Sequence, residues 1–72
     1  MCLAIPGRVV EVRGQQALVD FGGVKRTVYL TLLPREVKPG DYVMVHTGFA
    51  IEVVDQREAE EVWQLLKEAG VV

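Results

Sequence analysis

The sequence predicts a mainly β fold, a small five-stranded barrel followed by one C-terminal α-helix. Three observations predict this fold class. Apolar and polar residues alternate in short runs between residues 7 and 54, a period of two that is typical of half-buried strands. Turn-forming Gly and Pro residues separate these runs. From residue 55 onward apolar residues recur every three or four positions, the period of an amphipathic helix.

Five runs of alternating residues are predicted as strands. They are Gly7–Arg13, Ala17–Phe21, Val24–Leu30, Tyr42–His46 and Phe49–Val54. In the first run, Val10 and Val12 alternate with charged residues and are expected on the buried face. Gly22 and Gly23 are a two-residue hairpin signal, because both positions tolerate positive φ. Short strands joined by tight turns are typical of an OB-like barrel, which closes its sheet edges.

The connections after the third strand carry their own signals. Pro34 removes a backbone donor and predicts a loop or a short helical turn over residues 31–36. The stretch KPGD at residues 38–41 predicts a tight turn, because Pro presets φ and Gly supplies the permissive position. Gly48 interrupts the strand pattern and indicates a bulge or tight bend between the last two strands.

The C-terminal helix has recognisable ends. Asp55 is the expected N-cap, with Glu58 three residues later as in a capping box. Gly70 stands where a helix C′ residue is expected. The apolar stripe of this helix comprises Ala59, Val62, Trp63, Leu66 and Ala69. We therefore expect a single domain over residues 1–72, divided into an arm (1–6), a barrel (7–54) and a helix (55–70).

Composition excludes several classes of protein. A single Cys in 72 residues cannot form an internal disulfide and favours a reducing, intracellular setting. A net charge of −2 without a basic stripe disfavours a nucleic-acid partner. No apolar run approaches the roughly 20 residues of a membrane span, and the N-terminus lacks the regions of a signal peptide. We expect a cytoplasmic protein with no membrane partner.

Cys2 and His46 are the candidate functional residues. One Cys and one His cannot complete a closed zinc site, which takes four ligands, so any metal must be shared with another molecule or held in passing. A free Cys is often a small buried hydrophobe. At position 2, however, removal of Met1 would place the thiol beside the α-ammonium, which favours the reactive thiolate. His46 ends a predicted strand, where it is either solvated or a ligand.

The Pro6-Gly7 pair predicts a turn that leads into the first strand. Because Pro6 lacks an amide donor, we expect residues 1–5 not to prolong that strand. They would instead form a short apolar arm headed by the thiol of Cys2. Such an arm either folds back onto the barrel or enters a groove of a partner. Spacing in the sequence does not show whether Cys2 and His46 meet.

Two motifs resemble those of a known family. The stretch MCLAIPGRV at residues 1–9 is similar to the N-terminal signature of the HypC/HupF family of hydrogenase maturation chaperones. The stretch GDYVMVHTGFAI at residues 40–51 resembles the second motif of that family. The size, the strand content and the C-terminal helix also fit, so the resemblance covers essentially the whole chain.

The resemblance implies a function without enzymatic activity of its own. Members of the family help to assemble the iron unit of the nickel–iron hydrogenase active site, Fe(CN)2CO. They bind a HypD-like iron–sulfur scaffold protein and the precursor of the hydrogenase large subunit. Cys2 would make both contacts and hold iron, and His46 would be a second ligand or a supporting residue, with Pro6 and Gly7 supporting the motif. The iron unit would be carried transiently, with no permanent cofactor.

Two other functions are kept as alternatives. A generic OB-type module that binds nucleic acid needs exposed aromatic residues and a basic groove. A small thiol enzyme would use Cys2 as nucleophile and His46 as base, which requires the two side chains within hydrogen-bond reach.

Overall fold

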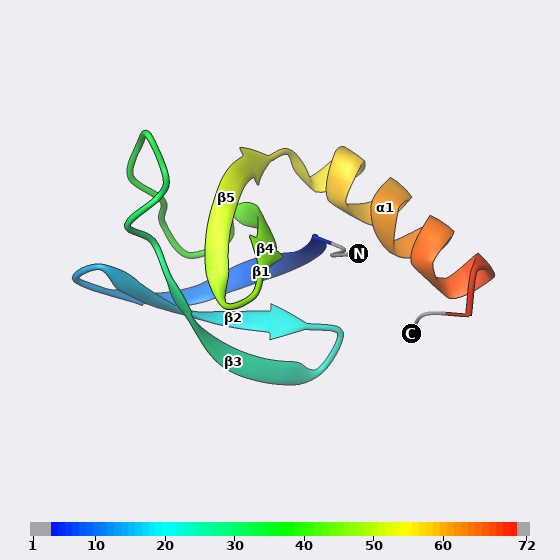
Figure 1. Ribbon diagram of the computed structural model, residues 1–72, viewed down its shortest axis with the longest axis horizontal. Helices are drawn as coiled ribbons and strands as arrows, with labels where there is room; N and C mark the ends of the chain where they lie inside the picture. Colours follow the sequence, from blue (N-terminus) through cyan, green and yellow to red (C-terminus); the bar gives the residue numbers. More distant parts are fainter. Residues whose placement is uncertain (1–3, 71–72) are drawn as a thin grey trace.

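The computed structural model describes residues 4–70 and has five strands and one helix (Figure 1). The elements are β1 (Ile5–Arg13), β2 (Gln16–Phe21), β3 (Val24–Tyr29), β4 (Tyr42–His46), β5 (Phe49–Val54) and α1 (Gln56–Glu68). The strands form a closed barrel in the order β1-β2-β3-β5-β4. The predicted fold class, a small five-stranded barrel with one C-terminal helix, is therefore confirmed.

The first strand starts earlier than predicted. β4 and β5 have the predicted bounds, whereas β1 begins at Ile5 and runs through Pro6. The expectation that Pro6 stops the strand is wrong for these two residues. Pro6 pairs only with Met44 of β4, because the pairing of β1 with β2 begins at Arg8, so its missing amide leaves no ladder hydrogen bond unmade on the β2 side. The rest of the predicted arm, Met1–Leu3, lies outside the described residues.

A β-bulge changes which residues of β1 face the core. The β1–β2 register shifts between Val9 and Glu11, so an extra residue is inserted at that point. Val9 is 1% exposed and belongs to the core, and Val12 packs against the core from beyond the bulge. Val10, which the alternation placed on the buried face with Val12, is only half-buried. The simple period of two fails here because the bulge resets its phase.

Small side chains fill the barrel. The core cluster consists of Val9, Ala17, Val19, Val28, Val43, Val45 and Ala50. Gly7 also faces inward: a Cβ there would overlap Val19 Cγ1 and lie 2.7 Å from Phe21 Cε1. A barrel of five strands has a narrow interior, and at Gly7 that interior has no room for a side chain.

A single residue pair closes the barrel. β3 and β5 run parallel and pair only at Tyr29 and Phe49. Tyr29 N donates a hydrogen bond of 2.9 Å to Gly48 O at this point. Beyond it the two strands diverge, and Figure 1 shows the β2–β3 ribbon curving away below β5.

The helix α1 packs against the outside of the barrel. Asp55 caps it by accepting a hydrogen bond of 2.8 Å from Glu58 N, as predicted, and Gly70 follows the helix with φ 76°. Ala59 and Leu66 are buried, and the helix contacts β1 and β4. Ala69, predicted in the apolar stripe, is instead the exposed C-cap residue. No helix within residues 4–70 is long and apolar enough to cross a membrane.

Replacing Gly7 by Ala tests the tight interior. The added methyl group would overlap Val19 and Phe21, so Gly7→Ala is expected to lower the free energy of unfolding by about 1–3 kcal/mol. Urea denaturation followed by circular dichroism measures this change. The control Arg8→Ala alters the neighbouring exposed side chain and its surface ion pair with Asp20, which is worth at most about 1 kcal/mol. Equal stabilities of the wild type and Gly7→Ala would contradict the packing.

Truncation of Trp63 tests the docking of the helix. Trp63 is half-buried, and its Cη2 would lie 3.7 Å from a methyl group at Gly22 in the β2–β3 turn. Truncation of a fully buried aromatic residue lowers the free energy of unfolding by about 3–5 kcal/mol. Because Trp63 is only half-buried, Trp63→Ala should lower it by less, about 1–3 kcal/mol. Thermal denaturation compares it with Leu65→Ala, whose side chain is 64% exposed. Equal effects of the two substitutions would mean that Trp63 does not anchor the helix.

Candidate functional site

His46 is the last residue of β4, and a tight turn follows it. The side chain is half-buried. Thr47 and Gly48 both have positive φ, 50° and 88°, which is the pattern of a two-residue type I′ hairpin. The bend predicted at Gly48 is therefore confirmed as a tight turn.

Thr47 holds this turn in a conformation that costs energy. A β-branched residue is rare at positive φ, and such strain is on the order of 1–3 kcal/mol. The hydroxyl of Thr47 donates a hydrogen bond of 2.7 Å to the carbonyl of His46, which partly offsets this cost. The turn sets His46 directly opposite Phe49 on β5.

His46 stands at one end of a row of aromatic residues. It pairs with Phe49, which in turn pairs with Tyr29 of β3. Because paired residues share a face of the sheet, the three side chains lie on the same outer face of the barrel. The rings of Tyr29 and Phe49 have centroids 5.5 Å apart and remain 45% and 37% exposed. The sequence-based site prediction did not include these aromatics.

The two sequence motifs pair with each other. Residues 5–8 of β1 run antiparallel to residues 42–45 of β4, with Ile5 opposite Val45 and Pro6 opposite Met44. Pro6 is buried on the outer face, whereas Gly7 points into the barrel. This register brings the start of β1 next to His46.

The remaining predicted ligand, Cys2, lies outside the described residues, and so does any contact between Cys2 and His46. Within residues 4–70, no group of three His, Cys, Asp or Glu side chains is placed to hold a metal ion.

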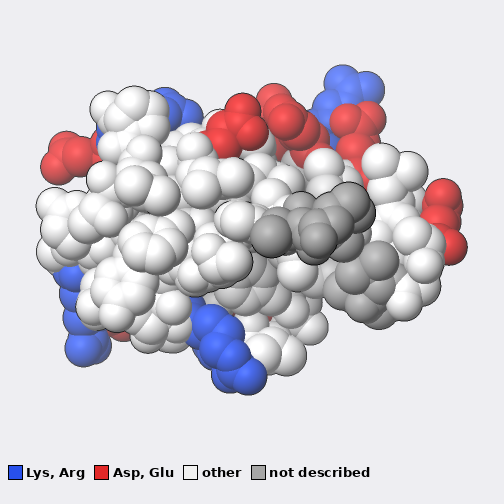
Figure 2. All heavy atoms as spheres, in the orientation of Figure 1, with Lys and Arg blue, Asp and Glu red and all other residues white. Residues whose placement is uncertain are grey.

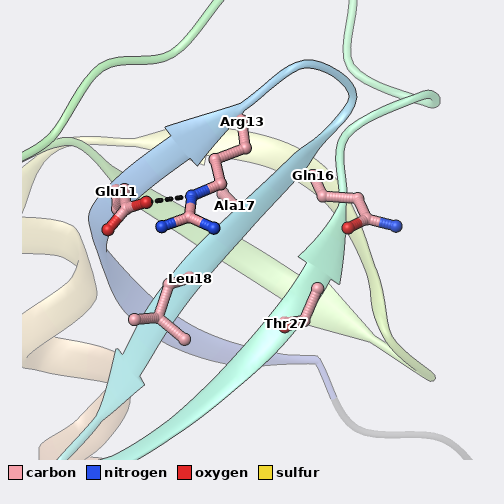
Figure 3. A pocket seen from close by; sticks show the side chains of 6 residues that line it. All are labelled: Glu11, Arg13, Gln16, Ala17, Leu18 and Thr27. Atoms are coloured by element: carbon pink, nitrogen blue, oxygen red, sulfur yellow. Dashed lines mark hydrogen bonds and ion pairs between the residues drawn. The ribbon is translucent and has the colours of Figure 1, made fainter.

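A shallow hollow of about 240 Å³ lies elsewhere, on the outer face of β1, β2 and β3. Figure 3 shows the Arg13 side chain turned toward Glu11 beside Leu18, and the two charged groups form an ion pair. The hollow therefore presents both signs of charge side by side and has no excess of positive charge for an anionic ligand.

The charge pattern of the visible face differs from that of a nucleic-acid module. Figure 2 shows Asp and Glu side chains along the upper edge, near the junction of β5 and α1, and a broad uncharged area beside them. On this face Lys and Arg side chains appear only as separate groups at the margins (Figure 2), without the continuous basic groove that single-strand binding requires.

Comparison with known proteins agrees with the motifs. A model of the HupF/HypC family matches residues 1–66. The chain is 47% identical to the hydrogenase maturation factor HypC of Synechocystis sp., over 99% of this chain and 100% of that protein. It is 49% identical to the factor of the same name from Cupriavidus necator, over 94% and 76%, and 36% identical to that of Escherichia coli K12, over 93% and 80%. The chain therefore belongs to the HupF/HypC family of hydrogenase maturation factors.

Proposed function

We propose that this protein is a chaperone that carries the Fe(CN)2CO unit during maturation of a [NiFe]-hydrogenase. It receives this cargo with a HypD-like scaffold protein and delivers it to the precursor of the large subunit, without catalysing a reaction of its own. The observation that best supports the proposal is the pairing of β1 with β4. This pairing anchors the start of β1 beside His46, three residues along the chain from Cys2.

The covalent chain limits how far Cys2 can be from this anchor. Ile5 lies opposite Val45, the neighbour of His46. Three residues span at most about 10 Å even when fully extended. This limit keeps the Cys2 thiol within reach of the imidazole, whichever path the intervening residues take.

The two side chains suit an iron cargo that must be released again. A Cys thiolate and a neutral imidazole are good ligands for iron. In the proposed cargo, two cyanides and one carbon monoxide already occupy most coordination positions, so one or two protein ligands are enough. Hand-over then proceeds by ligand exchange: a thiolate of the receiving protein forms a bond to iron as the Cys2 thiolate leaves, with no change of oxidation state.

The family name of its relatives supports interaction with other hydrogenase maturation proteins. We place this interaction in the cytoplasm, where thiols remain reduced and Cys2 stays available as a ligand. The exposed aromatic pair of Phe49 and Tyr29 supplies an apolar surface beside His46, which lies opposite Phe49.

Removal of the thiol is expected to abolish cargo binding without unfolding the barrel. Cys2→Ala should leave the melting temperature unchanged and reduce the iron that co-purifies with the HypD-like partner by about 10-fold or more. Infrared bands of cyanide and carbon monoxide, together with iron analysis, measure the loss. Arg35→Ala, in the exposed loop before β4, is the control. Undiminished iron in the Cys2→Ala complex would overturn the proposed role of Cys2.

Removal of the imidazole tests His46 separately. His46→Ala should lower iron retention by about 3- to 10-fold, a smaller loss than that expected for Cys2→Ala. The variant should unfold at the same denaturant concentration as the wild type. His46→Gln, which keeps a polar side chain without the imidazole, should behave similarly. If both variants retain full iron, His46 is not a ligand and the proposal reduces to Cys2 alone.

A further inference from the structure

The outer edge of β3 has no strand paired with it over most of its length. β3 pairs with β2 along all six of its residues, but on the other side only Tyr29 pairs, with Phe49. No other strand in residues 4–70 pairs with residues 24–28 on that side. We refer to this side of residues 24–28 as the β3 edge. Figure 1 shows it on a ribbon that diverges from β5.

The hydrogen bonds of Tyr29 show which backbone groups face the β3 edge. Tyr29 N donates toward β5, to Gly48 O, and in a strand the backbone groups of every second residue point to the same side. The amide and carbonyl groups of Thr27 and Lys25 therefore point to the β3 edge. The carbonyl of Lys25 accepts a hydrogen bond of 3.3 Å from the exposed side chain of Arg26, through Nη1, and an incoming strand would replace this hydrogen bond.

The charge of the β3 edge selects between possible occupants. Lys25 and Arg26 are both exposed. A second copy of this chain, paired antiparallel along the same edge, would bring its own Lys25 and Arg26 into neighbouring positions, and like charges there oppose pairing. An acidic strand would instead meet opposite charges on both faces, because Lys25 and Arg26 alternate between the two faces of β3.

We propose that the β3 edge is a docking site for an extended, acidic segment of a partner protein, which adds to the barrel as a further strand. Main-chain hydrogen bonds to Lys25 and Thr27 supply the affinity, as in other cases of strand addition. The two basic side chains supply the preference for acidic residues. This inference is independent of Cys2 and of the iron cargo.

The test uses the full chain labelled with nitrogen-15 and two capped hexapeptides, one alternating Glu and Val and the other Lys and Val. The Glu peptide at millimolar concentration should slow hydrogen exchange of the Lys25 and Thr27 amides by about tenfold, and added salt should weaken this effect. The Lys peptide should leave both amides unchanged. Absence of protection by the Glu peptide, or equal protection by both peptides, would overturn the proposal.

Two variants separate backbone pairing from charge. Thr27→Pro removes an amide that faces the β3 edge, so it leaves the β2–β3 ladder intact but should bind the Glu peptide at least tenfold more weakly than the control Thr27→Val. Equal binding by Thr27→Pro and Thr27→Val would refute strand addition.

The double variant Lys25→Glu, Arg26→Glu tests the role of charge, and it remains informative even if Thr27→Pro does not fold. This variant should prefer the Lys peptide over the Glu peptide. Dimerisation of the free chain through residues 24–28, detected by sedimentation, would refute an acidic partner.

Discussion

The narrowness of a five-stranded barrel is the constraint on which the rest of this structure depends. The fully buried core residues of its strands are all Val or Ala, and at Gly7 the interior has no room for any side chain. Strands that curl so tightly need irregularities, and β1 supplies one with the bulge after Val9. The same curvature leaves β3 and β5 paired at Tyr29 and Phe49 only, so the barrel is closed and yet has open strand edges.

This geometry also explains why the two sequence motifs lie together. Pairing of β1 with β4 requires Gly7 opposite Val43 and Pro6 opposite Met44, so residues from both motifs contribute to one part of the barrel wall. The hairpin turn at Thr47 and Gly48 then directs the chain back so that His46 faces Phe49. An imidazole, an exposed aromatic pair and the start of β1 are thereby held on rigid strands, which position a binding surface more accurately than loops do.

Much of the fold could be predicted because its signals are local. The alternation over β4 and β5 and the caps of α1 at Asp55 and Gly70 depend only on neighbouring residues. The start of β1 could not be predicted in this way. The rule that Pro ends a strand assumes that a neighbouring strand pairs with it on each side. Only the register shows that Pro6 pairs with β4 and not with β2. The bulge that buries Val9 likewise arises from closure of the barrel and leaves no signal in the period of two.

For the candidate site, the sequence supplies candidate residue types, and it does not supply their arrangement. His46 was recognised as the only imidazole, but the register that brings it beside the start of β1 and opposite Phe49 depends on pairs distant in sequence. The aromatic row has no signal in the sequence either, because Tyr29 and Phe49 belong to strands that are distant along the chain.

The position of β1 between β2 and β4 has a consequence for how the chain folds as it is synthesised. β1, β2 and β3 emerge from the ribosome first, and their mutual pairing requires only short loops to close. The first residues of β1 pair with β4 alone and remain unpaired until β4 has also emerged. The pairing that anchors the start of β1 is the same pairing that sets His46 beside it. Both therefore form in one late step, after β4 has emerged.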